Sequence, residues 1–572
     1  MPTLSIITVC KNPGAELDKT LASIVPHLND EIEYLIIDGG STDGTIKKLQ
    51  SLPNNIIWIS EPDSGIYEAM NKGILLSTGE WILMVNAGDE MMPGFISEFS
   101  KFINNNFDEG VIFGIAACYK NSTLIYSAVP NITVNKSQIL ENFFHPATLI
   151  HRNLHFRYGL YSTAFKVISD ILFLLKAINN DVKLYPVPFI FTKFYFGGIS
   201  SGSKIYYQEI KIYKQITKES IFIKNRWLFL AKVILTKTIN FIASILKNIL
   251  LQKSLQIDLS EKLSKNLKSK RQWIRLFNWL INFEKIGASS YLKFSFPKSL
   301  MINAMRHTWY QRKREIPVTI TLTSFAERFD ILEFAIDSLL TQSVSAQEIL
   351  IWLSPKDLKL LPRHYRRYEK YSIKFLGTED LKSYKKLVPA LLSDPKKTYV
   401  TFDDDFYYDK NTLFYLYYTH LRHPQAIISF GNDLIKIYSD EIQNFSRWKR
   451  PTELASKTII SHRIVPLSAC GALYPPNCFH AEVNNIRMFQ KICPHADDLW
   501  FWGMAVLNGT KIIGLPENLK GNHIDLQEKF RKPETQTLWS INKTANDEQF
   551  KNLLTEFSLI KQRLFADKIV AY

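Results

Sequence analysis

Cysteine is scarce in this chain of 572 residues, and its most apolar stretch has no long uncharged run. The five cysteines are odd in number and lack paired metal-site spacing, so we expect reduced thiols in a cytosolic compartment. In residues 227–251 the longest uncharged run is 238–246, far short of the ~20 residues that a membrane span needs. A strand pattern begins at Leu4, and we expect no signal peptide before it.

Acidic residues are also scarce, but only in the middle of the chain. Between Lys204 and Glu315 there are 23 Lys or Arg against 6 Asp or Glu, whereas the rest of the chain holds 47 and 48. The net charge of +16 therefore belongs to one segment. Basic residues of a nucleic-acid binder gather at its binding sites, and here they avoid the candidate sites identified below. We expect no nucleic-acid partner.

This middle segment, residues 206–315, reads as a basic helical linker. Residues 227–251 are apolar with lysines at every few positions, and residues 261–285 mix Lys and Arg with Trp and Phe. Basic amphipathic helices of this kind lie in the membrane interface, where anionic lipid attracts them. The alternative is a spacer whose apolar face packs on the flanking domains. We expect contact with the inner face of the cell membrane, from a cytoplasmic protein.

The regions on either side of the linker repeat one pattern, about 315 residues apart. At that offset Thr8 aligns with Thr323 and Asp89 with Asp404, and EYLII (33–37) aligns with EILIW (348–352). With some 13 further inserted residues, SDILF (169–173) meets DDLWF (497–501). Hydrophobic strands and acidic clusters that recur in one order indicate two copies of one architecture.

Each copy alternates strand and helix patterns, beginning with LSIITV (4–9) and VTITLT (318–323). This alternation predicts an α/β fold with two Rossmann-like, mainly parallel sheets. We expect domains at 1–205 and 316–572. Ligands collect at the carboxyl ends of parallel strands, and polar motifs follow several of these strands in both copies.

The densest of these motifs is Asp403-Asp404-Asp405, directly after TYVTF. Adjacent carboxylates are costly unless a cation lies among them. A hard divalent ion, with a nucleotide diphosphate as a further ligand, would neutralise them. The alternative is a solvated acidic turn. Asn86-Ala87-Gly88-Asp89 is the weaker counterpart, because only Asp89 is charged.

The first copy carries SIITVCKN, IIDGGSTDGT, EPDSGIYEAMNKGILLSTGEWILMVNAGDE, HPATLIHR and FGGISS. Over residues 3–205 this set resembles the family 2 glycosyltransferases of GT-A fold that build bacterial surface polysaccharides. The resemblance implies that Asp38 binds the nucleotide base and Asp63 lies by the ribose and diphosphate. Asp89 would be the metal-binding acid, with Asn86 in place of the family's first Asp. Asp170 would be the catalytic base.

The second copy is similar, more distantly, to another polysaccharide glycosyltransferase group of the same fold. The motifs are TLTSFAERF, KKLVPALL, TFDDDFYYD, GALYPP and HADDLWFWGMAVLNG, over about 317–548. The resemblance implies a metal pair at Asp403 and Asp405 and a base at Asp498 or its neighbour Asp497. Leu353 occupies the place of Asp38, so the second copy must recognise the base of its nucleotide differently. The remaining candidate donor-binding residues in the two copies are Thr8, Lys72, Thr323, Arg328 and Lys386.

These roles agree with the chemistry of sugar transfer. The departing diphosphate needs a divalent ion, Mn²⁺ or Mg²⁺, as a Lewis acid, and the acceptor hydroxyl needs a carboxylate to take its proton. Asp170 has a second interpretation, as the N-cap of a helix. His145 and His480 are left out of catalysis because a lone His is more often a structural hydrogen-bonding residue. The aromatic cluster 500–502 offers either a sugar-stacking face or core packing.

We therefore expect a bifunctional, metal-dependent, inverting glycosyltransferase. Its donors would be nucleotide sugars, and its acceptor a lipid-linked or growing capsule or O-antigen glycan. One rival is a single-activity enzyme with a silent glycan-binding half, most plausibly the half that carries Asn86. The other is a nucleotidyl- or phosphotransferase, which would release pyrophosphate.

Overall fold

The computed structural model describes residues 2–103, 108–120, 123–128, 144–163, 165–196, 209, 314–521, 523–526 and 538–571. Both amphipathic stretches of the expected linker, and with them the expected membrane contact, lie outside these residues. Within the described part of the chain, no helix is both long and apolar enough to cross a bilayer.

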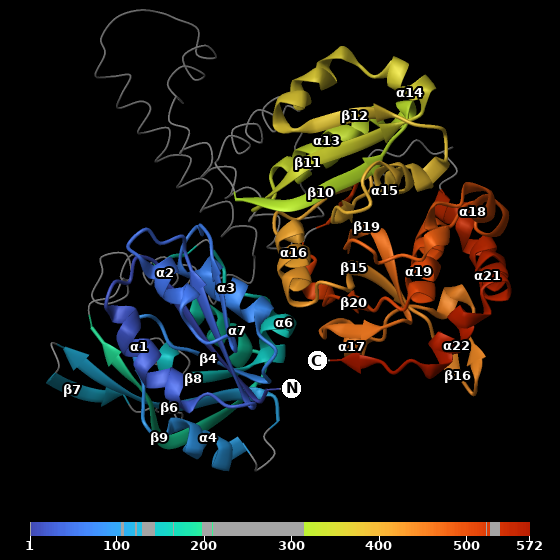
Figure 1. Ribbon diagram of the computed structural model, residues 1–572. Helices are drawn as coiled ribbons and strands as arrows, with labels where there is room; N and C mark the ends of the chain where they lie inside the picture. Colours follow the sequence, from blue (N-terminus) through green and yellow to red (C-terminus); the bar gives the residue numbers. More distant parts are fainter. Residues whose placement is uncertain are drawn as a thin grey trace, which may run out of the picture.

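The N-terminal half is a mixed β-sheet with helices packed on both faces (Figure 1). The strand order is β3-β2-β1-β4-β8-β6-β9-β5, and β7 pairs with β6. The strands are β1 (Leu4–Cys10), β2 (Ile32–Asp38), β3 (Ile56–Ser60), β4 (Trp81–Met84), β5 (Glu90–Met91), β6 (Gly110–Lys120), β7 (Thr123–Ala128), β8 (Thr148–His151) and β9 (Lys183–Tyr195). The helices are α1 (Glu16–Ile24), α2 (Thr45–Gln50), α3 (Ile66–Leu76), α4 (Phe95–Ile103), α6 (Arg152–Tyr158) and α7 (Ser169–Ile178).

The C-terminal half holds a second sheet, with the order β12-β11-β10-β13-β19-β15-β20-β18-β22. Its strands are β10 (Glu315–Thr323), β11 (Ser345–Leu353), β12 (Ile373–Gly377), β13 (Tyr399–Thr401), β15 (Ile427–Leu434), β18 (Ile459–Ser461), β19 (Ile464–Tyr474), β20 (Ile512–Gly514) and β22 (Val570–Ala571). Short pairs lie outside it, formed by β14 (Phe406–Tyr407) with β21 (Ile524–Asp525) and by β16 (Ile437–Tyr438) with β17 (Glu441–Ile442). The helices are α13 (Phe329–Leu340), α14 (Pro355–Leu360), α15 (Val388–Ser393), α16 (Thr412–Arg422), α17 (Thr452–Ala455), α18 (Ile486–Ile492), α19 (Asp497–Asn508), α21 (Leu538–Glu556) and α22 (Ser558–Ala566).

The two sheets share one topology. The run β3-β2-β1-β4-β8-β6-β9 of the first corresponds to β12-β11-β10-β13-β19-β15-β20 of the second. Each pair of neighbours also has the same relative direction in both halves. A repeated order of this length, with repeated directions, supports the internal duplication expected from the sequence.

Both sheets are mixed, whereas the alternation of strands and helices predicts mainly parallel ones. The first four strands of each run are parallel, but β8 and β19 are antiparallel to both of their neighbours. Parallel pairing needs a crossover connection, usually a helix. Such helices separate β1, β2, β3 and β4, and likewise β10, β11, β12 and β13, but the pattern does not extend across the whole sheet.

The register corrects the alignment of the two copies. Asp38 and Leu353 are equivalent, because each ends the second strand of its copy and its carbonyl oxygen accepts the same hydrogen bond. The donor is the N–H of the residue directly after the third strand, which is Glu61 for Asp38 (2.9 Å) and Thr378 for Leu353 (2.9 Å). Thr8 pairs with Ile36, and Leu322 pairs with Ile351. Thr8 is therefore equivalent to Leu322, not to Thr323. A shift of one residue moves every side chain to the other face of a sheet.

Helix α3 lies between its own sheet and the C-terminal half. Its residues from Ala69 to Leu76 are all buried, as expected for a helix covered on every side. A Cβ at Gly73 would lie 2.5 Å from a methyl carbon of Ile7, so only glycine permits this approach to β1. On the other side α3 contacts α16, and Leu75 belongs to the same hydrophobic cluster as Leu413 and Leu416 (Figure 1). The two halves thus share part of one core.

Candidate active sites

Asp38 ends β2 at the carboxyl edge of the first sheet and is completely buried. Its carboxylate accepts hydrogen bonds from the backbone N–H of Ser41 at 2.8 Å and from the hydroxyl of Ser60 at 2.6 Å. The hydroxyl of Ser41 donates to it as well. Several donors therefore hold this carboxylate in one orientation at the predicted base-binding position.

Asp63 lies against the turn that follows Asp38, because a Cβ at Gly39 would collide with the Asp63 carboxylate. Burial raises the pKa of Asp63, and the positive charge of Lys72 opposes that rise. Lys72 itself is 1% exposed, and its ammonium lies 2.9 Å from Glu61 Oε1 and 3.2 Å from the carbonyl oxygen of Pro62. Lys72 thus supports the loop that carries Asp63, while direct contact with a donor stays a prediction.

Asp89 is buried beside the end of β4 and precedes β5. It accepts a hydrogen bond from the N–H of Tyr195 at 3.1 Å. Burial raises its pKa to about 7, and the nearby Glu16 adds to this effect. The side-chain oxygen of Asn86 is buried and has no hydrogen-bond partner among the described residues. Glu16 therefore lies near Asp89 at this strand end, where Asn86 also buries an unpaired oxygen, although the sequence motif pointed only to Asp89 and Asn86.

Asp170 is the second residue of α7, where two groups that we did not predict contact it. The hydroxyl of Tyr67 donates to Asp170 Oδ1 at 2.8 Å, and His145 Nδ1 lies 3.6 Å from Oδ2. Burial lowers the pKa of His145, while Asp170 opposes that fall. The N-cap of α7 is Ile168, without a side-chain cap bond, so the N-cap interpretation of Asp170 is wrong.

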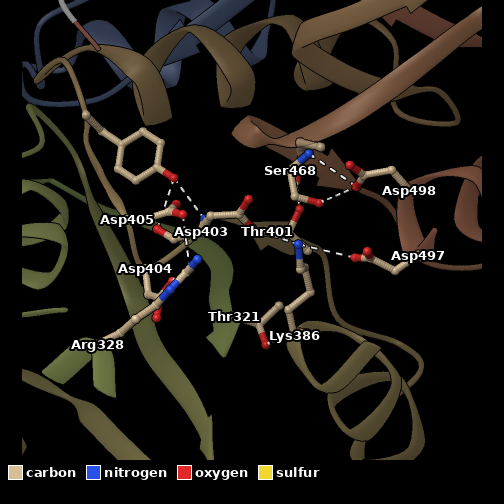
Figure 2. A network of polar contacts seen from close by, with 12 residues as sticks. Thr321, Arg328, Lys386, Thr401, Asp403, Asp404, Asp405, Ser468, Asp497 and Asp498 are labelled. Atoms are coloured by element: carbon tan, nitrogen blue, oxygen red, sulfur yellow. Dashed lines mark hydrogen bonds and ion pairs between the residues drawn. The ribbon is translucent and has the colours of Figure 1, made fainter. Parts of the chain in front are cut away.

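In the second half, Asp403, Asp404 and Asp405 lie together after β13 (Figure 2). Lys386 Nζ is 2.7 Å from Asp403 Oδ1 and 3.2 Å from Asp497 Oδ2. Figure 2 shows Lys386 between the aspartates after β13 and those at the start of α19. Lys386 therefore joins two acidic groups that are more than ninety residues apart in the sequence.

Arg328 is the second cation among these acids. Its guanidinium lies 2.6 Å from Asp404 Oδ1 and 3.0 Å from Asp405 Oδ2. The hydroxyl of Ser324 also donates to Asp404, at 2.5 Å. Asp404 thus faces Arg328 and Ser324, while Asp403 and Asp405 are the pair that the resemblance assigns to metal binding.

Asp498 is the second residue of α19, as Asp170 is of α7. The hydroxyl of Ser468, on β19, donates to Asp498 Oδ1 at 2.7 Å. Since α7 leads to β9 and α19 to the equivalent β20, the two predicted bases hold equivalent places. Ser468 was not identified from the sequence, because it lies in an ordinary strand pattern.

Burial and mutual repulsion shift the titration of this acidic cluster. Burial raises the pKa of Asp405 to about 7, with further contributions from Asp404 and Asp403. Burial, followed by repulsion from Asp497, raises the pKa of Asp498 to about 7. Burial alone would lower the pKa of Lys386, but the surrounding aspartates raise it well above its usual value.

The predicted threonines use their hydroxyls within the fold. The hydroxyl of Thr8 donates to the carbonyl oxygen of Val85 at 2.8 Å, and that of Thr323 donates to the carbonyl oxygen of Trp352 at 2.8 Å. Their contact with a donor stays a prediction. The aromatic cluster of Trp500, Phe501 and Trp502 is completely buried, so its members are core residues and not a sugar-stacking face.

The residues after β4 and after β13 offer carboxylate or amide oxygens, the ligand atoms that a hard cation prefers. The orphaned oxygen of Asn86 and the buried carboxylate of Asp89 offer oxygen ligands, and Glu16 lies nearby but is paired with Lys19 at 2.9 Å. In the second half, Lys386 and Arg328 face five aspartates. Among the described residues no group of three or more His, Cys, Asp or Glu could hold a metal by itself. A cation here would need substrate oxygens too, as Mg²⁺ commonly does.

The N-terminal half matches a known family. Residues 5–169 match the sequence model described as Glycosyl transferase family 2. A "PGL/p-HBAD biosynthesis glycosyltransferase" of Mycobacterium bovis (strain BCG / Pasteur 1173P2) is 26% identical over 207 residues, which make up 35% of this chain and 80% of that protein. An uncharacterized glycosyltransferase of Mycobacterium tuberculosis (strain CDC 1551 / Oshkosh) is 37% identical over 90 residues, 15% of this chain and 34% of that protein.

Two solved structures resemble part of the chain. S. aureus TarS 1–349 in complex with UDP-GlcNAc has a TM-score of 0.31 and 18% identity, over 36% of this chain and 61% of that chain. The mannosyltransferase PcManGT from Pyrobaculum calidifontis, in complex with GDP-Man and Mn²⁺, has a TM-score of 0.26 and 16% identity, over 33% and 56%. Both matches span less than two thirds of the solved chains.

Proposed function

We propose that this glycosyltransferase, whose residues 5–169 form a family 2 domain, carries a second sugar-transfer site in its C-terminal half. One observation carries the proposal: both sheets repeat the same strand order and directions and bear acidic residues at equivalent strand ends. Asp403 follows β13 as Asn86 follows β4, and Asp405 precedes β14 as Asp89 precedes β5. The domains would be 1–205 and 316–572, joined by the basic linker 206–315.

In the N-terminal site a nucleotide sugar would lie over the ends of β1, β2 and β4. Asp38 would bind the nucleotide base, and Asp63 would lie by the ribose and diphosphate. Asp170 would take the proton of the acceptor hydroxyl, because Tyr67 and His145 hold its carboxylate at the start of α7. A single displacement with the base opposite the leaving group inverts the anomeric carbon.

Asp89, with Asn86 beside it, would hold a divalent cation in this site, and Asp403 with Asp405 would do so in the second. Such an ion, Mn²⁺ or Mg²⁺, neutralises the charge that develops on the departing diphosphate. The protein's own part is to fix these carboxylates at the sheet edge, with Tyr195 bonding to Asp89.

In the C-terminal site Asp498 would act as the base, fixed by Ser468. Lys386 and Arg328 already lie among the acids and would approach the diphosphate from the protein side. Leu353 stands where Asp38 stands in the first half, so this site would recognise its nucleotide differently. Different donors at the two sites suit a product built from two alternating sugars.

The acceptor would be a lipid-linked or growing bacterial surface glycan, of the capsule or O-antigen kind. The excess of 17 positive charges between Lys204 and Glu315 supports contact with the anionic inner face of the membrane. Two sites on one chain would raise the effective concentration of the acceptor end at each of them.

Two variants of the full chain test the proposal, Asp170→Asn and Asp498→Asn. Each would be incubated with a panel of nucleotide sugars and a glycan acceptor, and products identified by mass spectrometry alongside the released nucleoside diphosphate. We expect each variant to lose one linkage and keep the other. Loss of the same single linkage in both variants would contradict two separate activities, and a variant that keeps every linkage would indicate a silent half.

A further inference from the structure

Two buried glutamates of the N-terminal half are bound by residues of the C-terminal half. Glu61 pairs with Lys72 from its own half. Tyr418 of the C-terminal half and Arg314, at the end of the linker directly before β10, also bind it, and we name these four residues the Glu61 cluster. The hydroxyl of Tyr418 donates to Glu61 and accepts a hydrogen bond from Arg314. Glu61 and Tyr418 are only 5% and 0% exposed, so this contact is internal to the molecule.

The Glu61 cluster adjoins the predicted donor site. Glu61 follows β3 directly, and its N–H donates to the carbonyl oxygen of Asp38 at 2.9 Å. Asp63 is two residues farther along the chain. Lys72 bonds to the carbonyl oxygen of Pro62 at 3.2 Å, between the two acids. The cluster therefore contacts the loop that carries Asp63 through the side chain of Glu61 and through a carbonyl oxygen.

We propose that Tyr418 and Arg314 are positioning residues for the nucleotide donor of the N-terminal site. The C-terminal half, in addition to bearing a site of its own, completes the donor loop of the first half through Glu61. This inference rests on the proposed function, in which Asp38 and Asp63 bind the donor.

The physical reason is that a buried carboxylate requires its partners. When one partner of a buried charged group is removed, the group pays a desolvation cost that its bonds had offset. Glu61 can lower that cost by moving toward solvent. Such a movement would displace the backbone that bonds to Asp38 and, with it, Asp63.

The same interface provides a matched control at Glu33. Arg422 of α16 lies 2.5 Å from Glu33 Oε1 and 3.0 Å from the hydroxyl of Thr78. Glu33 is likewise buried, but it lies near the beginning of β2, five residues before Asp38. At about 3.3 Å per residue these two positions are roughly 16 Å apart along the strand. Arg422 thus joins the halves by the same chemistry, away from the donor site.

The experiment compares Tyr418→Phe and Arg314→Gln with Arg422→Gln, all in full-length Asp498→Asn protein, where only the N-terminal site turns over. The donor KM, kcat and melting temperature are measured for each. For the two cluster variants we expect KM to rise about 5-fold or more with kcat changed less than about 2-fold, as a lost hydrogen bond to a charged group permits. Arg422→Gln should lower the melting temperature and leave KM unchanged.

An unchanged KM in both cluster variants would overturn the inference, and so would an equal rise of KM in Arg422→Gln. If Tyr418→Phe does not fold, Arg314→Gln decides, since Arg314 is partly exposed and directly precedes β10. If the proposed function itself is wrong, a different result is expected. In that case Asp38→Ala would transfer sugar with the same donor KM as its Asp498→Asn parent.

Discussion

The hydroxyl of Tyr67 donates a hydrogen bond to Asp170 Oδ1 at 2.8 Å, across more than one hundred residues of sequence. Tyr67 lies at the beginning of α3, four residues after Asp63, and Asp170 lies at the beginning of α7. The bond therefore connects the loop of the predicted donor site with the predicted base.

Asp170→Asn should abolish most transfer at the N-terminal site, because an amide cannot accept the acceptor's proton. A general base typically contributes 10²–10⁴-fold, so kcat should fall by about that factor. Tyr67→Phe should lower kcat less, by about 10-fold, since it removes one bond that orients the carboxylate. Rates would be measured in the Asp498→Asn background. Asp30→Asn, at an exposed position, is the control, and a Tyr67→Phe effect as large as that of Asp170→Asn would contradict these roles.

The C-terminal site should gain activity as the pH rises through about 7. Burial raises the pKa of Asp498 to about 7, and a protonated carboxyl cannot act as a base. In the Asp170→Asn background the rate should therefore be low at acidic pH and reach a plateau above the pKa. Circular dichroism over the same range would show that the protein stays folded. A rate that is independent of pH would exclude Asp498 as the base.

Asp89→Asn should make the N-terminal site insensitive to chelation. In the Asp498→Asn background, EDTA should reduce transfer by about 10²-fold or more if a cation neutralises the diphosphate. The added substitution Asp89→Asn should cause a similar loss, and EDTA should then have little further effect. Asp108→Asn, an exposed residue paired with Lys183, is the control. If EDTA still caused its full loss of transfer in the Asp89→Asn variant, a cation held by Asp89 would be contradicted.

Gly73→Ala should destabilise the contact between α3 and β1. The added Cβ would lie 2.5 Å from a methyl carbon of Ile7 in a buried site, and overpacking of this kind costs about 1–3 kcal/mol. Urea unfolding would measure the change in the free energy of unfolding. Lys47→Ala on the exposed side of α2 should change it by less than about 0.5 kcal/mol. If Gly73→Ala changed the free energy of unfolding as little as Lys47→Ala does, α3 would be able to shift away from β1.

Much of the fold was predictable from local patterns. The apolar runs LSIITV and VTITLT predicted β1 and β10, and the acids after apolar strands predicted where polar groups would collect. The alignment of the copies was correct for Asp38 with Leu353 but wrong by one residue at Thr8. It was also wrong at Asp89, whose place before the next short strand corresponds to Asp405 and not to Asp404. Hydrophobic alternation allows several registers, and only the hydrogen bonds between strands distinguish them.

The acidic residues of the candidate sites could be identified from the sequence, but the side chains that bond to them could not. Asp170 and Asp498 were identified because their motifs resemble those of the two glycosyltransferase groups, whereas the local pattern of an acid before an apolar run also suited an N-cap. Ser468 lies in an ordinary strand pattern, and nothing local marks it as a partner of an acid. Tyr67 and His145 belong to motifs that carry the resemblance, but their contact with Asp170 depends on how distant parts of the chain pack. Burial of Trp500 and Trp502 likewise depends on packing, since the aromatic cluster by itself suited a core, which was favoured for at least one member, and also a sugar-binding face.

By itself, the sequence determined the order of strands and helices, the duplication, and the placement of carboxylates at strand ends, because these follow from periodicity and spacing along the chain. Only the tertiary structure decided how the two halves meet. Glu61 and Tyr418 are 357 residues apart, and their hydrogen bond exists because α3 and α16 pack into one core. Contacts of this kind depend on the shapes of whole elements, which no local pattern records.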